Sequence, residues 1–554
     1  MPVQATTERR LPGASTPPTG VTVADADSRL PGRKLLALVA ATICVYLYLQ
    51  TFVLPAVPVL QRDDQITFVV NAMRMLHGEM IYLDFYQYTP PGTDLVYLGL
   101  FKAFGVRAWI ASAVVVLLGM ATFFVCYVVA TRVMPRNSAC LASAVFSVFV
   151  FGAMANGTHH WYSALLIMCA VLSVLARRTP ARLASAGILV AFASFFTQTR
   201  VLSLLALGAF VAWENHVRHR PRRFALQCQA SLLLGFAGAL LLLNAYFLRH
   251  TGLQYLLANQ VVALGRSAFT FKSYLLGFPA LPPWHLAPRA VGFILVYLLL
   301  PAVYVFSMIR LARKKAQDYS SDDERILLLS LIGVALFLEV LPAPNWVRLF
   351  PISMPAIILG MRGLVGKGNL RMLARRTLWA ATAIAGLLLA VSAQARPHGT
   401  LVLPAGKVVV YDNTLAMKLT ELADKTRPGD FFFQAAWLDL YFPLQLRNGS
   451  YFEALSTSST PAQVKNVIEA LERHQVKCVL WSARLDISSA DSTGKDVLQP
   501  VRNYLKEHYR VVERFAPGDD LWERTSDHPG PFAPDGTFLP RISVLPRKPP
   551  AAPR

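Results

Sequence analysis

The chain has 554 residues, of which 54% are hydrophobic and only 16% are charged. A soluble protein normally carries about 25% charged residues, so the composition excludes a disordered, collagen-like or ordinary cytosolic protein. The formal net charge is +22, but no basic stretch interleaved with aromatic residues accompanies it. Lys and Arg concentrate in the cytoplasmic loops of membrane proteins. We therefore expect a polytopic membrane protein and no nucleic-acid partner.

The predicted elements begin with residues 1–34, which are rich in Pro, Thr, Gly and Arg and are expected to form a disordered cytoplasmic tail. A transmembrane module over 35–395 follows, and it contains eleven apolar segments that we interpret as membrane spans. These segments lie at about 35–58, 108–131, 138–155, 161–176, 182–197, 201–215, 224–247, 290–309, 326–341, 350–365 and 377–394.

The apolar segment 90–104 decides the topology, because it is short for a crossing and contains Asp94 and Lys102. If it does not cross, the loops expected in the cytoplasm carry 19 Lys and Arg residues, against 10 in the longer external loops. If it crosses, this bias reverses, against the positive-inside rule. We therefore interpret 90–104 as an interfacial or re-entrant helix within a first external loop, 59–107. The N-terminus is then cytoplasmic, and everything after residue 395 is outside.

The C-terminal part, 396–527, has the pattern of a small α/β domain outside the membrane. Alternation of short apolar runs with amphipathic segments predicts strands and helices in turn. The strands are expected at 408–411, 430–434, 476–481 and 510–515, and the helices at 413–425, 461–474 and 497–508. The last residues, 528–554, are rich in Pro and are expected to form a loose tail.

The first external loop contains a predicted amphipathic helix that follows two adjacent carboxylates, Asp63 and Asp64. Apolar residues from Ile66 to Leu76 recur at helical spacing, and Gly78 is well placed to end the helix. Such a helix would lie in the plane of the membrane interface. The acidic pair then has two interpretations: helix capping, worth roughly 0.3–1 kcal/mol per carboxylate, or a general base for a hydroxyl or amine acceptor.

Several motifs of this region follow one another in a recognisable order. After the acidic pair come Gly78-Glu79-x-x-Tyr82-x-Asp84-Phe85, then Pro90-Pro91-Gly92, then Phe101-Lys102-x-Phe104-Gly105. Together with one preceding span, this order resembles the GT-C superfamily, and within it the protein O-mannosyltransferases, lipid A aminoarabinose transferases and rhizobial lipopolysaccharide core glycosyltransferases. The specific match covers about residues 55–200.

The resemblance implies an α-helical GT-C-like bundle with interfacial helices, a polyprenyl-phosphate-linked sugar as donor, an inverting transfer, and a catalytic acid in the first external loop. That role carries over to Asp63 or Asp64, with Asp63 slightly favoured. Glu79, Tyr82 and Asp84 of the matching motif are predicted to bind substrate. The acceptor would be a glycolipid, polysaccharide or protein outside a bacterial inner membrane.

Three further external positions could bind the phosphate of the carrier, since a phosphate leaving group needs positive charge nearby. His159 and His160 stand about where the aminoarabinose transferases carry an Asp, and an imidazole pair could instead donate hydrogen bonds. Arg200 follows a Thr-Gln-Thr turn where related chains carry Thr-Lys-Gly. Arg348 lies in a segment that resembles the Arg-Tyr-x-x-Pro pattern of many relatives. Each cation could equally extend to lipid headgroups.

The chain also departs from the resemblance. Tyr88-Thr89-Pro90 replaces the Glu-Lys-Pro of some relatives, which removes a suggested metal-binding Glu. No Cys or His spacing predicts a metal site. We therefore predict no cofactor, and the sequence leaves open whether a divalent metal is needed. Two other functions stay open: a membrane transporter or lipid-linked glycan flippase, and an assembly protein without catalytic activity.

Overall fold

The computed structural model describes most of the chain between residues 32 and 525. The described ranges are 32–61, 64–176, 178–254, 257, 287–315, 318–341, 345–366, 368–457, 459–486, 496–516 and 518–525. The predicted N-terminal tail up to residue 31, the Pro-rich tail from 528, and Asp63 lie outside them.

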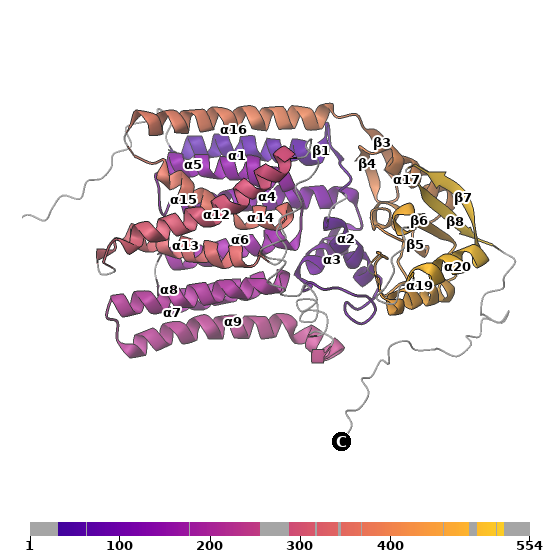
Figure 1. Ribbon diagram of the computed structural model, residues 1–554, viewed down its shortest axis with the longest axis horizontal. Helices are drawn as coiled ribbons and strands as arrows, with labels where there is room; N and C mark the ends of the chain where they lie inside the picture. Colours follow the sequence, from indigo (N-terminus) through magenta and orange to yellow (C-terminus); the bar gives the residue numbers. More distant parts are fainter. Residues whose placement is uncertain are drawn as a thin grey trace, which may run out of the picture.

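The greater part of the described chain is a bundle of roughly parallel helices (Figure 1). Within the part of the chain that the structure describes, six helical stretches are long and apolar enough to cross a membrane. They are α1 (Gly32–Thr51), α4 (Ala108–Ala130), the stretch Arg136–Met154, α9 (Arg222–Thr251), Ile294–Ala312 within α12 (Ala287–Ala312), and α16 (Asn369–Ala395). The stretch Arg136–Met154 consists of α5 (Arg136–Val145), the π-helix Phe146–Phe151 and the 3-10 helix Gly152–Met154.

Shorter helices complete the bundle, so that each of the eleven predicted spans falls on helical structure. They are α6 (His159–Ala176), α7 (Pro180–Phe196), the 3-10 helix Gln198–Val201, α8 (Leu202–Val217), α13 (Ser321–Leu338), α14 (Trp346–Ile352) and α15 (Met354–Gly363). The first predicted span is too long by several residues. The helix ends at Thr51, because Pro55 and Pro58 cannot continue it, and a short antiparallel pair follows, β1 (Phe52–Val53) with β2 (Val57–Pro58).

The loops predicted to be cytoplasmic meet at one end of the bundle. Arg218 lies 2.5 Å from Glu324, and Arg178 lies 3.4 Å from the same carboxylate. Arg362 likewise lies 3.2 Å from Asp322. Four of these loops are thus held together by ion pairs at the start of α13. Their position at one end of the bundle agrees with the charge bias, which assigns all four loops to the same side of the membrane.

Two helices of the first external loop lie outside the row of parallel helices. Figure 1 shows α2 (Gln65–Leu76) and α3 (Gly92–Phe104) between the bundle and the C-terminal sheet. The 13 residues of α3 span about 20 Å, less than the roughly 30 Å hydrocarbon core. This length agrees with the interpretation of 90–104 as a helix that does not cross. Gly78 ends the α2 segment as predicted, with φ of +90°.

The C-terminal residues that the structure describes form the expected α/β arrangement with two strands more than predicted, β3 (Gly399–Leu403) and β8 (Asp519–Arg524). A hairpin of β3 (Gly399–Leu403) and β4 (Gly406–Val410) precedes a four-stranded sheet in the order β5-β6-β8-β7. The strands of this sheet are β5 (Phe432–Gln434), β6 (Cys478–Ser482), β7 (Tyr509–Phe515) and β8 (Asp519–Arg524), and only β5 and β6 are parallel. The helices are α17 (Asn413–Lys425), α18 (Tyr441–Leu444), α19 (Pro461–Arg473) and α20 (Gln499–His508), with a 3-10 turn at Ala483–Leu485.

The first external loop and the C-terminal domain share one hydrophobic core, in which α2 and α3 side chains pack with those of β4, α17 and α18. Backbone hydrogen bonds join the two parts as well, from Leu60 N to Val409 O and from Tyr86 N to Tyr451 O. The face of α2 that was expected to be polar is consequently buried, with Asn71 0% and Arg74 4% exposed. The C-terminal domain therefore covers α2 on its polar side as well, and the position of this helix in the plane of the membrane interface stays a prediction.

Candidate functional site

The structure brings five of the predicted residues to the end of the bundle that faces α2. Asp64 precedes the first residue of α2, and His159 and His160 open α6. Arg200 lies in the 3-10 helix between α7 and α8, and Arg348 lies in α14. The positive charge of Arg348 interacts electrostatically with the Asp64 carboxylate and with both imidazoles. One carboxylate, two guanidinium groups and two imidazoles are thus gathered from several segments of the chain.

Asp64 occupies the N-cap position of α2, yet its side chain accepts no hydrogen bond from the helix. The capping interpretation of the acidic pair therefore does not describe this residue. Burial of the carboxyl raises the pKa of Asp64, and the charge of Arg348 partly offsets that rise. The guanidinium of Arg348 forms no ion pair with any residue that the structure describes, so its charge is available to an anion. Asp63 lies outside the described residues.

The imidazole rings of His159 and His160 lie with their centroids 3.9 Å apart and their planes tilted by 39°. Phe68 of α2 contacts His159 edge-on, with the ring centroids 5.2 Å apart. His159 is buried, and its Nδ1 atom makes no hydrogen bond within the described chain. A buried ring nitrogen without a partner is costly. His159 is therefore suited to a bond with a bound ligand.

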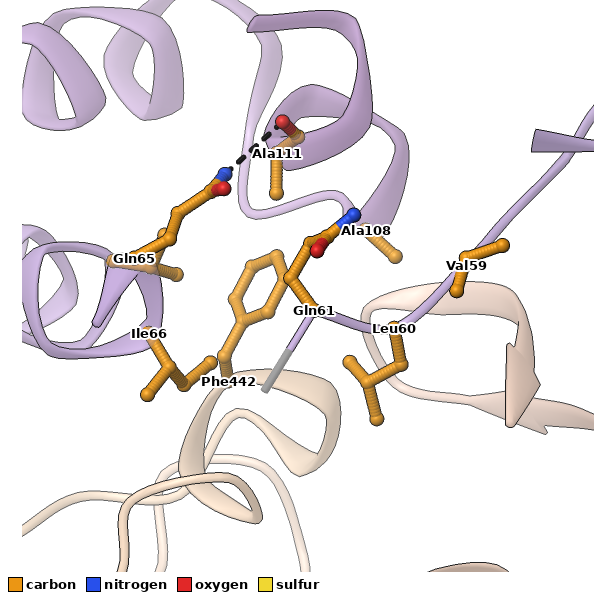
Figure 2. Close-up of a pocket in the computed structure, with 9 residues that line it drawn as sticks. Val59, Leu60, Gln61, Gln65, Ile66, Ala108, Ala111 and Phe442 are labelled. Carbon is orange, nitrogen blue, oxygen red and sulfur yellow. Dashed lines mark hydrogen bonds between the residues drawn. The ribbon is translucent and has the colours of Figure 1, made fainter. Parts of the chain in front are cut away.

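Gln65 fixes the loop that precedes these histidines. Its Oε1 accepts from Gly157 N at 2.8 Å, and its Nε2 donates to Ala111 O at 3.0 Å (Figure 2). Tyr97 of α3 donates to Gly157 O at 3.0 Å. A Cβ atom at position 157 would lie 2.2 Å from the Tyr97 hydroxyl, so only glycine fits. The residue after Asp64 thereby ties α2 to the turn that carries His159.

A small cavity lies beside Gln65, and Figure 2 shows the side chains around it. Its lining is mostly apolar and consists of Val59, Leu60, Gln61, Gln65, Ile66, Val69, Ala108, Ala111 and Phe442. None of the charged candidate residues is among these. The cavity therefore belongs to the junction of α2, α4 and the C-terminal domain rather than to the candidate site.

The side chains of the other three predicted residues are engaged elsewhere, within the first external loop, and Glu79 also contacts the C-terminal domain. Glu79 lies 2.7 Å from Arg74 and 3.7 Å from Arg447. Tyr82 is fully buried with φ of +73°, and its hydroxyl donates to a backbone carbonyl. Asp84 accepts a bond from a backbone N–H four residues earlier. Among the described contacts, none joins these three residues to the candidate site formed by Asp64, the two histidines and the two arginines.

Sequence reasoning missed a second polar group beneath the site. Asp94 is fully buried in α3, and Gln87 donates to it at 3.5 Å. Asn71 of α2 lies beside Asp94 and beside Glu453 of the C-terminal domain. Burial raises the pKa of Asp94 to about 8 and that of Glu453 to about 7. Asn71, Asp94 and Glu453 are far apart in the sequence and share no pattern. The only sequence signal among them was Asp94, an acidic residue within a short apolar segment.

We expect the Glu453→Gln variant to lose the part of the pH dependence of stability that Glu453 contributes, while the part that Asp94 contributes remains. Because the folded-state pKa of Glu453 is raised, its stabilising contribution is complete below the unfolded pKa of about 4.5 and is lost as the pH rises through about 7. A tenfold change in a protonation equilibrium corresponds to about 1.4 kcal/mol. The variant should therefore melt above the wild type at pH 8 and near it at pH 5.

The measurement is thermal unfolding of the full-length protein in detergent between pH 5 and pH 9. Glu421→Gln is the matched control, because Glu421 is a partly exposed glutamate on α17 that pairs with a lysine one turn away. An identical pH dependence for wild type and Glu453→Gln would contradict the prediction.

Within the described residues, no three His, Cys, Asp or Glu side chains gather in a way that could hold a metal ion. Asp64 and the two histidines belong to the site, but the remaining predicted residues there are arginines. The side chains gathered at the site can provide proton transfer at the Asp64 carboxylate and electrostatic stabilisation of an anion by arginine.

No family model matches the sequence, and no curated protein matches it either. The fold does resemble solved structures. The oligosaccharyltransferase of Archaeoglobus fulgidus, tethered to an acceptor peptide, aligns with TM-score 0.50 and 12% identity over 89% of this chain and 74% of that chain. The archaeal oligosaccharyltransferase AglB from the same organism, in complex with an inhibitory peptide and a dolichol-phosphate, aligns with the same score and identity over 90% and 75%.

ArnT from Cupriavidus metallidurans bound to undecaprenyl phosphate aligns over 89% of this chain and 98% of that chain, with 12% identity and TM-score 0.41. The two alignments with TM-score 0.50 establish the fold and, at 12% identity, not the reaction. The resemblance to the GT-C superfamily that the motif order of the first external loop indicates is confirmed at the level of architecture. The chain has the fold of the GT-C glycosyltransferases.

Proposed function

We propose that this protein is an integral-membrane, inverting glycosyltransferase. It would transfer a sugar from a polyprenyl-phosphate carrier to an acceptor outside the cytoplasm of a bacterial cell. The observation that carries the proposal is the uncapped carboxylate of Asp64 near Arg348, whose guanidinium has no ion-pair partner in the described chain, at one end of a GT-C-type bundle. The structure of an archaeal protein with this fold has been solved in complex with a dolichol-phosphate, which supports a lipid-phosphate ligand.

The reaction follows from the charges. The carboxylate of Asp64 takes the proton of an acceptor hydroxyl or amine. The electron pair that this frees attacks the anomeric carbon of the sugar from the face opposite the phosphate, and the bond between that carbon and the phosphate oxygen breaks. The polyprenyl monophosphate leaves with the bonding electrons, and Arg200 and Arg348 stabilise its growing negative charge. The configuration at the anomeric carbon is thereby inverted.

The choice of Asp64 over Asp63 is part of the proposal. A base must be ionised, and the neighbouring charge of Arg348 favours the ionised form of Asp64. His159 and His160 would donate hydrogen bonds to the sugar or phosphate. Glu79, Tyr82 and Asp84 would contribute to substrate binding indirectly, by holding the first external loop against the C-terminal domain.

The test is transfer by the purified full-length protein in detergent, with synthetic polyprenyl-phosphate sugars and lipid or oligosaccharide acceptors. We expect polyprenyl monophosphate and a glycoside of inverted configuration as products. In proteoliposomes, movement of a fluorescent lipid-linked sugar between leaflets without any transfer would instead support a flippase. That result would overturn the proposal.

A further inference from the structure

Arg200 and Glu339 form a buried ion pair at the candidate site. The Nη1 atom of Arg200 lies 2.6 Å from Oε2 of Glu339, and each side chain is 3% exposed. Glu339 directly follows α13, 139 positions further along the chain. Burying two charges costs a desolvation energy that their attraction only partly repays. Stability alone is therefore a poor explanation of this pair.

Hydrogen bonds fix the guanidinium of Arg200 on two sides. Its Nε atom donates to the Ser163 hydroxyl at 2.9 Å, and its Nη1 atom donates to Glu339. Thr199 donates to the same oxygen of Glu339 at 2.9 Å, which orients the carboxylate in turn. A planar guanidinium held at two of its three nitrogens has little freedom to rotate.

Two polar atoms of this group make no hydrogen bond within the described residues. One is Nη2 of Arg200, which is the amino group left over after Ser163 and Glu339 are bound. The other is the buried Oε1 atom of Glu339. The charges of Arg200 and Arg348 both reach the imidazoles of the site. An anion bound among these groups would accept a hydrogen bond from the remaining amino group of Arg200. The carboxylate of Glu339, on the other side of the guanidinium, would repel the same anion.

We propose that Glu339 is the positioning residue for Arg200 and that its charge selects a carrier with one phosphate over a carrier with two. The inference rests on the proposed function, because it takes Arg200 as a ligand of the carrier phosphate. A carboxylate that holds Arg200 also repels whatever anion Arg200 attracts. The Coulomb energy scales with the product of the charges, so Glu339 repels a diphosphate more strongly than a monophosphate and offsets the stronger attraction of the arginines for a diphosphate.

The test compares polyprenyl monophosphate and polyprenyl diphosphate of the same chain length, bound to the full-length protein in detergent. Glu339→Gln keeps an oxygen for Arg200 and Thr199 but removes the charge. We expect it to bind the monophosphate within about threefold of the wild type and to gain about tenfold in its relative affinity for the diphosphate. Glu339→Ala should weaken monophosphate binding about tenfold, because Arg200 loses its anchor.

Two further variants keep the test independent of folding. Ser163→Ala removes the other anchor of Arg200 without changing any charge, and it should weaken both ligands by a similar factor of about three. Glu324→Ala is the matched control, because Glu324 is an equally buried, arginine-paired glutamate in the first turn of α13, at the opposite end of the helix. It should leave both affinities and their ratio unchanged.

The outcomes separate the inference from the proposed function. If the wild type and the Arg200→Ala variant bind neither carrier, the proposed function fails. If the wild type binds the monophosphate and Arg200→Ala does not, the proposed function survives. An unchanged ratio of the two affinities in Glu339→Gln, with wild-type binding in Glu339→Ala, would then overturn the role of Glu339.

Discussion

Replacement of Asp64 by asparagine is expected to lower the rate of sugar transfer by about 10²–10⁴-fold, the usual contribution of a general base, without lowering stability. Asparagine and aspartate are equally good at an N-cap position, so a purely structural role predicts almost no effect of this change. The variant therefore separates the two interpretations of the acidic pair. The measurement is single-turnover transfer together with the melting temperature of the same preparation.

The pH dependence of the rate gives a second readout of the same prediction. The base must be ionised, so kcat/KM should fall as the pH drops through the pKa of Asp64. Arg348 lowers that pKa, and Arg348→Gln should therefore move the acid limb of the profile to higher pH. The direction of this change follows from the loss of a positive charge near the carboxylate.

Two comparisons control the Asp64 experiment. Asp412→Asn changes another N-cap aspartate, one whose side chain does bond to the helix that it precedes, α17, in the C-terminal domain. It should leave transfer at the wild-type rate. Asp63→Asn is the direct alternative, because the sequence slightly favours Asp63 as the base. Full activity in Asp64→Asn together with inactivity in Asp63→Asn would assign the role to Asp63 and refute this prediction.

Much of the fold could be predicted from local patterns. Long apolar runs mark the helices of the bundle, and Gly78 marks the end of the α2 segment, because each signal depends on a few neighbouring residues. The strand β8 was missed for the opposite reason. Its sequence, Asp519–Arg524, is rich in acidic residues that strands usually disfavour, yet it pairs with both β6 and β7. Contacts across the sheet outweigh the local preference.

The candidate site was predictable residue by residue but not as an arrangement. Asp64, Arg200 and Arg348 could be named from the sequence because each stands in a short segment that resembles a motif of the GT-C superfamily. Glu339 could also be recognised from the sequence as an acid near the end of an apolar segment, but its pairing with Arg200 could not, since the two residues are 139 positions apart. Glu79 illustrates the converse. A motif singled it out for substrate binding, whereas its contacts with Arg74 and Arg447 connect two parts of the fold.

Arg74 is the centre of that connection, and the Arg74→Ala variant is expected to lose about 3–5 kcal/mol of stability, as removal of one partner of a buried ion pair usually costs. Its side chain is 4% exposed. It binds Glu79 at 2.7 Å, donates to Ser450 O at 2.8 Å and lies 4.7 Å from the ring centre of Phe85. These contacts join α2 to the loop that follows it and to the C-terminal domain.

The measurements are the melting temperature in detergent and the rate of proteolysis between the bundle and the C-terminal domain, both of which should change in Arg74→Ala. Lys465→Ala is the control, because Lys465 forms an exposed ion pair with Glu469, and such pairs contribute about 0–1 kcal/mol. Glu79→Gln then distinguishes the two roles of Glu79. A role in holding the loop predicts a lower melting temperature with an unchanged KM for the donor. A raised KM at wild-type stability would instead restore Glu79 to the substrate site, and the motif would have indicated its role correctly.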